Sequence, residues 1–427
     1  MSFWSEFNAS SQEEWNAKIA KDLKGKELSR NTICDPFIFQ STKSTQSKFP
    51  ENIFLNGDFD LRYSSNEYIL NSLRYGVNAI TLKNGAYDEK LLKNVMHEII
   101  ATHIEFSSKD LLQTKDSWYA WKKKIGNVSG SFRFDPIACY IKNGKWESSK
   151  DDDLNNWIDS YKEAAVLDFE SVFVDGTIYG NAAFSPSFQI AFIAAHLNEY
   201  LELIKSDAKT AIKVIVKHAV GVNYFLEIAK LRALRNVLQS IAHHRKINIE
   251  LIIESETSKT ALSPIDVDTN LIRITTTAMA SFVGGSNIIS NIPHDYFSET
   301  KDKNAQRLAI NISHIIQEES KVNEISDPLK GSHVIEELTD LLKNESWNLF
   351  KNIEEKGGWL NYYQSENIAK VNKENVQKRT EKIVSGDDSV IGFNKYRLSS
   401  DKNLKITAKN YEAKVAEFVE LELKKLI

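Results

Sequence analysis

Residues 166–178 decide the fold of this chain. They read Val166-Leu167-Asp168-Phe169-Glu170-Ser171-Val172-Phe173-Val174-Asp175-Gly176-Thr177-Ile178. β-Branched and aromatic residues dominate positions 166–174 and partly alternate with polar ones, which predicts a strand. Ser185 and Pro186 are typical of a helix N-cap and first turn, and a helix is predicted from there to Tyr200. A loop between the carboxyl end of a strand and a helix is where barrel enzymes hold their active-site residues.

Strand-like and helix-like segments alternate on both sides of this unit. Strands are predicted at residues 78–82, 102–106, 127–134, 248–253 and 287–289, and residues 213–219 fit a strand or a helix start. Helices are predicted at residues 89–100, 109–124, 224–243, 266–282 and 305–319, and helices without strands at 334–355, 366–384 and 411–426. Repeated strand-helix order predicts parallel strands with right-handed crossovers, and seven or eight such units fit a closed (β/α)8 TIM barrel. A doubly wound open sheet is the alternative.

Composition bounds the class of protein. A chain of 427 residues, 42% of them hydrophobic, can bury a large core in one barrel or in two to three domains. The net charge of -4 arises from 54 basic and 58 acidic residues without a long basic block, which disfavours a nucleic-acid partner. Cys34 and Cys139 lie far apart and in no metal-ligand spacing, as expected in a reducing compartment. With no signal peptide and no apolar stretch of roughly twenty residues, we expect a soluble cytoplasmic protein without a membrane partner.

Few residues indicate chemistry by themselves. The pair His243-His244 fits a surface helix end better than a metal site, because neighbours on a helix point in different directions. Gly284-Gly285-Ser286-Asn287 fits a tight turn, since it has neither phosphate-loop nor dinucleotide spacing. Glu254 and Glu256 end one predicted strand and Asp175 ends another, so carboxylates for acid-base chemistry would lie at the active-site end of a barrel. Polar residues terminate most barrel strands, however, and these residues leave the activity open.

Eight blocks then follow one another in a recognisable order. They are Gly221–Arg235, Asn270–Arg273, Ala278–Gly285, Gln317–Ser320, Asp327–Ser332, Ile335–Thr339, Glu354–Gly358 and Ile391–Tyr396. Together they resemble the methylmalonyl-CoA mutase family over about residues 76–398. The resemblance implies a (β/α)8 barrel that, in catalytic chains, passes the pantetheine arm of CoA along its axis. A separate flavodoxin-like domain holds adenosylcobalamin, which supplies the radical that interconverts methylmalonyl-CoA and succinyl-CoA.

The chain departs from the catalytic pattern at three places. Gly176-Thr177-Ile178 stands where catalytic chains have Gly-Tyr-His, so that an alkyl group replaces the imidazole at the substrate. Lys213-Val214-Ile215 aligns with the family's Arg-Leu-Ser, and Glu256-Thr257-Ser258-Lys259 with its Gln-Thr-Ser-Gly. The resemblance therefore implies a vestigial substrate site without catalytic, cofactor or metal ligands. Its expected lining residues are Thr177, Ile178, Lys213, Ile215, Glu256 and Lys259.

The cobalamin-binding flavodoxin-like domain is expected to be absent. The family's Asp-x-His-x-x-Gly motif does not occur in the sequence, and only about thirty residues follow Tyr396, too few for a domain. Phe132–Ala138 also resembles the version of this region found in non-catalytic small chains. We expect an N-terminal arm at residues 1–51 that contacts a partner subunit, a degenerate barrel at 52–356 and a C-terminal helical extension at 357–427.

The resulting hypothesis is a small, structural subunit of a heterodimeric adenosylcobalamin-dependent mutase. The cofactor would lie on the large catalytic partner, and the chain would be part of an isomerase only within that complex. The alternative is an acyl-CoA-binding barrel of a split mutase, active only with a separate cobalamin-domain chain. A third possibility is an unrelated barrel hydrolase that uses Glu254 and Asp175. An open or a filled barrel axis would discriminate the first two hypotheses.

Overall fold

The structure is a computed structural model. It describes residues 53–60, 66–83, 103–107, 129–166, 169, 171–204, 211–263, 266–298, 302, 304–325, 327–366 and 368–396, with isolated positions at 14, 17, 18, 21 and 123. Predicted segments 89–100 and 411–426 lie outside the described residues, as do all of 109–124 except position 123 and almost all of the N-terminal arm. None of the described helices is both long and apolar enough to cross a membrane.

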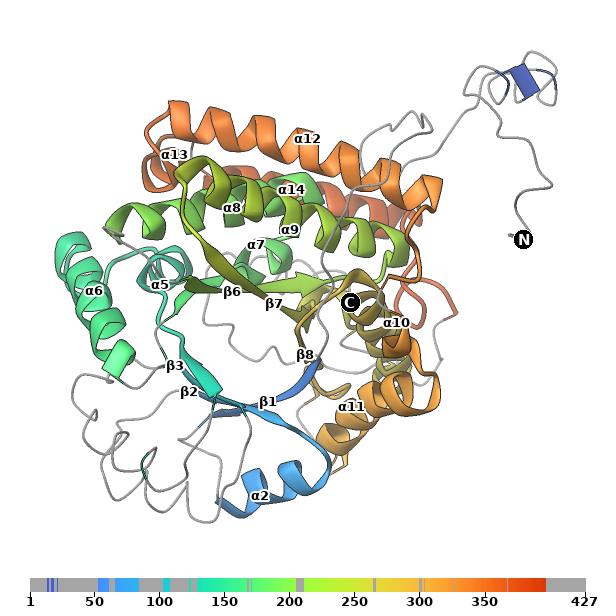
Figure 1. Cartoon of the computed structure of the whole chain (residues 1–427). Coiled ribbons are helices and arrows are strands. Elements are labelled where there is room, and N and C mark those ends of the chain that lie inside the picture. Colours follow the sequence, from blue (N-terminus) through green and yellow to red (C-terminus); the bar gives the residue numbers. More distant parts are fainter. Residues whose placement is uncertain are drawn as a thin grey trace, which may run out of the picture.

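Eight parallel strands form one curled sheet (Figure 1). The strands are β1 (Phe54–Asp60), β2 (Ala79–Lys83), β3 (His103–Ser107), β4 (Ser129–Phe132), β5 (Val172–Asp175), β6 (Ile212–Val220), β7 (Ile249–Thr257) and β8 (Ile288–Ser290). Their order is β4-β3-β2-β1-β8-β7-β6-β5. No ladder joins β4 to β5 in the described part of the chain. The architecture is therefore α/β with a parallel sheet, consistent with a TIM-like barrel.

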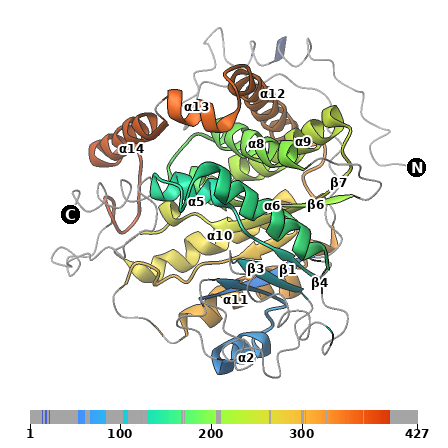
Figure 2. The ribbon, with the colours of Figure 1, turned by 90° about the vertical axis from the view of Figure 1, so that its left-hand side faces the viewer.

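Helices cover the outside of this sheet (Figures 1 and 2). They are α2 (Asn66–Arg74), α5 (Pro136–Asn143), α6 (Lys150–Val166), α7 (Thr177–Asn181), α8 (Pro186–Leu203), α9 (Tyr224–Arg245), α10 (Asn270–Gly284), α11 (Ala305–His314), α12 (His333–Glu355), α13 (Trp359–Ser365) and α14 (Ile368–Ser385). A π-helical turn, Ile315–Glu319, ends α11. The ambiguous segment 213–219 belongs to a strand, β6, and every described helix predicted above is present with shifted ends.

The strand predicted at residues 166–174 is too long. Helix α6 runs through Val166, the backbone N–H of Phe169 bonds back to Ala164 O at 3.0 Å, and β5 begins only at Val172. Val166 thus ends a helix and Phe169 bonds back to that helix, and periodicity over so short a stretch did not separate helix from strand. Residues 177 and 178, predicted as loop, begin the short helix α7. This helix lies close to β6, because a Cβ on Gly180 would stand 2.7 Å from that of Ala219.

Helix boundaries follow local chemistry. Asp135 caps α5, since its Oδ1 accepts the N–H of Ala138 at 2.8 Å, and Gly144 ends that helix with φ +68°. Ser185 does occupy the N-cap position of α8, with Pro186 following it, but its hydroxyl makes no capping bond. Gly285 ends α10 at φ +86° and turns the chain into β8, as predicted for the glycine pair.

The main core lies between the sheet and helices α8 and α9. Helix α8 is buried on nearly all sides, because α12 packs on α8 and α9 as an outer layer (Figures 1 and 2). Trp359, fully buried at the start of α13, joins this core with its ring centroid 4.6 Å from that of Phe192. The start of α13 is therefore packed against the strand-helix unit.

Candidate functional site

Alternate residues of β5 and β6 face opposite sides of the sheet. Val174, Val214 and Val216 pack in the cluster beneath the helices. Because side chains alternate along a strand, Asp175, Ile215 and Lys217 face the concave side. The sequence of each strand thus divides into an apolar outer face and a partly charged inner face.

Register places these inward residues in two layers. Phe173 on β5, Ile215 on β6 and Ile252 on β7 are aligned partners and form an apolar layer. Two residues further along, Asp175 is aligned with Lys217, and Lys217 with Glu254. The carboxyl ends of these strands therefore hold a layer of charged side chains above an apolar one.

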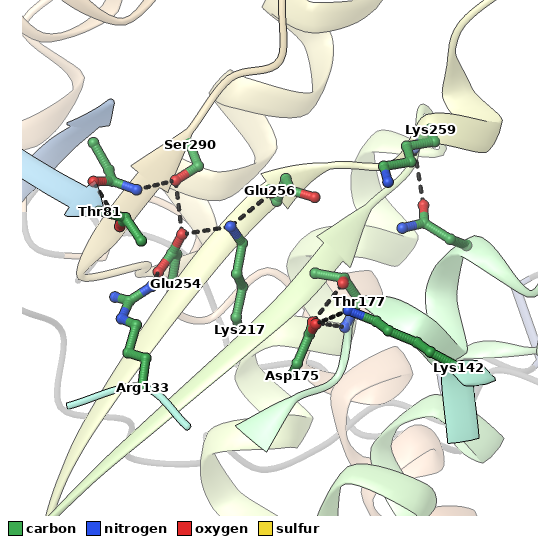
Figure 3. Close-up of polar contacts among 12 residues, drawn as sticks. Thr81, Arg133, Lys142, Asp175, Thr177, Lys217, Glu254, Glu256, Lys259 and Ser290 are labelled. Atoms are coloured by element: carbon green, nitrogen blue, oxygen red, sulfur yellow. Dashed lines mark hydrogen bonds and ion pairs between the residues drawn. The ribbon is translucent and has the colours of Figure 1, made fainter. Parts of the chain in front are cut away.

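Lys217 joins two carboxylates of β7 (Figure 3). Its Nζ lies 3.1 Å from Glu254 Oε1 and 2.6 Å from Glu256 Oε2. Arg133, directly after β4, forms an ion pair with Glu254 Oε2 through Nη1. All four side chains are buried, and that of Glu254 has no exposed surface. Opposite charges compensate one another here, as burial requires.

Neutral groups extend this network along the sheet. Ser290 of β8 donates to Glu254 Oε1 at 2.7 Å, Asn56 Nδ2 of β1 donates to Ser290 Oγ at 2.9 Å, and Thr81 of β2 donates to Asn56 Oδ1 at 3.1 Å (Figure 3). The network therefore contains residues of β1, β2, β6, β7 and β8, with Arg133 reaching it from the end of β4. Side chains of this chain occupy the concave side at this level.

A second charged group lies at the end of β5. Lys142 Nζ of α5 is 2.7 Å from Asp175 Oδ2, and Thr177 Oγ1 donates to Asp175 Oδ1 at 2.5 Å. Burial acts to raise the pKa of Asp175, but the charge and hydrogen bond of Lys142 outweigh it and hold that pKa well below its usual range. Burial likewise acts to lower the pKa of Lys142, and Asp175 raises it above its ordinary value. Asp175 is thus a paired carboxylate, which is unsuited to act as a general acid at neutral pH.

Asp135 fixes the end of β5 from the other side. Its Oδ2 accepts the backbone N–H of Asp175 at 2.8 Å, and its Oδ1 accepts the hydroxyl of Tyr200 at 2.6 Å. His196 Nε2 lies 3.0 Å from the same Oδ1, while its Nδ1 lies 3.1 Å from the hydroxyl of Tyr179 in α7. These buried contacts hold α7 and α8 to the end of the strand and give residues 175–179 one fixed arrangement.

The expected lining residues occupy different environments. Thr177 bonds to Asp175, whereas Ile178 is buried in the apolar cluster formed with α8. Lys213 lies near the amino end of β6, where its Nζ donates to Gly130 O at 3.2 Å, and Ile215 is fully buried in the apolar layer. Lys213 is therefore separated along β6 from the charged layer at Lys217.

Glu256 and Lys259 do lie at the strand ends. Glu256 is paired with Lys217, so it meets opposite charge there. Lys259 Nζ lies 5.4 Å from the ring centroid of Tyr296, and its backbone N–H donates to Asn181 Oδ1 at 2.9 Å. Burial lowers the pKa of Lys259, against the opposing charge of Glu256. The structure thus brings Thr177, Glu256 and Lys259 to one end of the sheet and leaves Lys213 at the other.

Sequence reasoning overlooked three cations of this site. Lys217 has a readable signal, because it follows Lys213 and Ile215 at the period of two that marks one strand face. Arg133 and Lys142 lie near or in α5, a helix that was not predicted, and no spacing connects them with Glu254 or Asp175. Of the other candidates, His243 and His244 lie in the last turn of α9, and no cluster of metal-ligating side chains occurs among the described residues.

The longest family-like block forms contacts within the scaffold. In α9, Lys230 Nζ donates to Ala219 O at 2.7 Å, and Arg235 Nη2 donates to Gly285 O at 2.7 Å. Arg232 bonds to both carboxylate oxygens of Asp327 at 2.7 and 2.8 Å and to Glu336 Oε1 at 2.8 Å. The charged residues of this helix hold neighbouring segments in place.

Comparison with known proteins agrees with the family resemblance of these blocks. Residues 117–426 match the family model described as methylmalonyl-CoA mutase. The chain is 25% identical over 450 residues to the methylmalonyl-CoA mutase small subunit of Porphyromonas gingivalis, covering 92% of this chain and 71% of that protein. It is 29% identical over 248 residues to the large subunit of the same organism, covering 56% of this chain and 34% of that protein.

The same level of similarity extends to a eukaryotic relative. The chain is 29% identical over 267 residues to the probable mitochondrial methylmalonyl-CoA mutase of Caenorhabditis elegans, covering 60% of this chain and 36% of that protein. It thus spans about a third of the length of this relative and of the large subunit. The match over residues 117–426 includes most of the chain, and the chain belongs to the methylmalonyl-CoA mutase family.

Proposed function

We propose that this chain is the small, structural subunit of an adenosylcobalamin-dependent methylmalonyl-CoA mutase, paired in the cytoplasm with a large catalytic subunit. The similarity to a protein named as a small subunit supports this proposal. A large subunit from the same organism is also a relative, which supports a pair of homologous chains. In this proposal the partner performs the isomerisation of methylmalonyl-CoA and succinyl-CoA.

The observation that carries the proposal is the ion pair between Arg133 and Glu254. The strands β4 and β7 are not neighbours in the sheet, so this contact crosses the concave side where a pantetheine arm would run in a catalytic barrel. Opening that path would separate buried opposite charges, at a cost of several kcal/mol. The position of Ile178 also supports a structural role for this chain, because its side chain belongs to an apolar cluster where catalytic chains would present an imidazole.

The proposal includes closure of the sheet into a degenerate (β/α)8 barrel over residues 52–356. The backbone N–H of Phe132, at the end of β4, donates to Phe169 O at 2.9 Å, and Ser171 Oγ donates to Phe132 O at 2.6 Å. Both bonds connect the end of β4 with the residues that precede β5. Residues 1–51 then form the arm that contacts the large subunit, and residues 357–427 form the helical extension.

The residues at the strand ends do not fit a cobalamin-dependent active site of this chain. Thr177 and Ile178 offer a hydroxyl already bonded to Asp175 and an alkyl group, and Glu256 is paired with Lys217. We therefore derive no step through that cofactor from these residues and assign the cofactor to the partner.

Coexpression with a large mutase chain tests the proposal. We expect the two chains to copurify in equal amounts and the complex to interconvert the two CoA esters with adenosylcobalamin, while the small chain alone gives no turnover. Turnover by the isolated small chain would contradict the proposal. Titration calorimetry of the isolated chain with methylmalonyl-CoA tests the alternative: measurable binding would favour an acyl-CoA-binding subunit, and we expect none.

A further inference from the structure

Three carboxylates gather where α8, α12 and α13 meet. Glu199 and Glu202 lie one turn apart on α8, and Glu354 is the last residue but one of α12. Glu354 also begins the block Glu354-Glu355-Lys356-Gly357-Gly358, one of the stretches that resemble the family, and this block has no part in the function proposed above. This block connects the strand-helix unit to the helical extension.

The cation at this junction is already engaged. Arg245, at the end of α9, has its Nη2 2.5 Å from Glu202 Oε1 and donates from Nε to Asn198 Oδ1 at 2.5 Å. The amide of Asn198 then donates to Glu354 Oε2 at 2.7 Å. Glu354 therefore receives a neutral hydrogen bond from the residue that stands between it and the cation. Its other oxygen, Oε1, is buried and has no hydrogen-bond partner among the described residues.

Glu199 holds the start of α13. Its Oε1 accepts the backbone N–H of Leu360 at 3.1 Å. Gly358 adopts φ +88°, and a Cβ at that position would lie 2.7 Å from the same oxygen. The carboxylate thus fits closely against a turn that requires glycine, so the turn is sensitive to any displacement of α8 relative to α12.

Helix α9, which packs on α8 and α12, carries three further charged or titratable side chains near its end, His243, His244 and Lys246, and all three are exposed. Helix α13 contains no residue that is charged at neutral pH. Lys356, in the turn, pairs with Glu366 at 2.6 Å on the surface, and Glu355 of α12 is exposed. Burial first, and then the charges of Glu202 and Glu199, raise the pKa of Glu354 to about 7, against the opposing hydrogen bond of Asn198 and charge of Arg245. Loss of its proton near neutral pH would leave an additional negative charge among like charges.

We propose that the junction of α8, α12 and α13 is a pH-responsive latch, closed when Glu354 is protonated and loosened when its proton is lost. The proton removes one charge from the group of carboxylates, which lets α12 stay against α8 and keeps Glu199 on the N–H of Leu360. Deprotonation adds repulsion between Glu354 and the two acids of α8. The turn at Gly357 and Gly358 then opens more often, and with it the attachment of the helical extension.

Hydrogen exchange across the physiological pH range tests the latch. The readout is the protection factor of the peptide spanning residues 357–365, measured on the full chain at about pH 6 and about pH 8.5 and corrected for the intrinsic rate at each pH. Because Glu354 is only partly buried, we expect a loss of protection of roughly tenfold, less than the full pKa shift would give. A flat profile of the wild-type protein overturns the proposal without any variant.

Two substitutions and one control identify the group. Glu354→Gln keeps an acceptor for Asn198 and removes the charge, so its protection should stay constant over this range. Glu355→Gln, at the exposed neighbour, should lose protection as the wild type does. Glu202→Gln removes a like charge, and its loss of protection should move to lower pH. An E354Q profile equal to the wild-type profile, or an unmoved midpoint in E202Q, contradicts the assignment to Glu354.

Discussion

Arg133 and Glu254 form an ion pair between the end of β4 and β7, two strands that are not neighbours in the sheet. The two residues are 121 positions apart in the sequence. Lys217 reaches the same carboxylate from β6. The ion pair therefore spans the concave side of the sheet with the chain's own side chains.

Replacing Arg133 by methionine should strongly destabilise the fold. The change leaves Glu254 buried, and within the described part of the chain it keeps its ion pair with Lys217, which also pairs with Glu256. We expect a loss of about 3–5 kcal/mol in the free energy of unfolding, measured by urea denaturation. Lys162→Met, which breaks an exposed pair with Asp159 at 3.7 Å, is the control and should change stability by less than about 1 kcal/mol. Equal effects of the two changes would mean that the pair does not hold the interior.

Introducing an imidazole at position 178 should not create a substrate site in this chain. Ile178→His places a polar ring in an apolar cluster, and we expect a cost of about 1–3 kcal/mol with no binding of methylmalonyl-CoA. Ile178→Val, the matched control, removes one methylene group and should cost about 0.5–1.5 kcal/mol. Thermal unfolding and calorimetry measure the two effects. A histidine variant as stable as the wild-type chain would show that position 178 has access to water.

The carboxylate of Asp175 should make the free energy of unfolding depend on pH in the acid range. Its pKa in the folded chain is held below the unfolded value of 3.8, so its contribution is present above about pH 4 and disappears as the pH falls through the folded value. Asp175→Asn should therefore lower the unfolding free energy by roughly 2 kcal/mol at neutral pH, and the difference should shrink below about pH 4. Urea denaturation between about pH 7 and pH 3 measures this difference. Asp151→Asn, at an exposed position of α6, is the control substitution.

Arg232 should not tolerate replacement by lysine. Nη1 of its guanidinium donates to both carboxylate oxygens of Asp327, and Nη2 donates to Glu336 Oε1. A single ammonium group cannot reproduce this geometry. Arg232→Lys should cost about 2 kcal/mol or more and increase hydrogen exchange in residues 327–332. Arg245→Lys is the control, because that side chain is partly exposed and its loss should leave exchange in this loop unchanged. Unaltered exchange at residues 327–332 in the Arg232 variant would contradict the role of Arg232 in holding the loop.

The family and the parallel α/β class could be predicted from the sequence, because both depend on local patterns. Strand-helix alternation predicted most described elements, and the block Gly221–Arg235 coincides with α9. The strand at 166–174 was wrong at its start, since the apolar residues at the end of α6 are followed by those of β5 without a break in the sequence pattern. β1, α2 and α6 were missed, and so was α5, which depends on a cap by Asp135, a short local signal.

The sequence by itself determined which residues share a face of a strand. Lys213, Ile215 and Lys217 must therefore point to the same side of β6. Only the tertiary structure decided what meets them there. Arg133 and Lys217 converge on Glu254 because the sheet curls and brings β4 opposite β7, and Lys142 reaches Asp175 because Asp135 starts α5 beside the end of β5. The physical reason is that the partners of buried charges are set by distances in three dimensions, about which a pattern of period two contains no information.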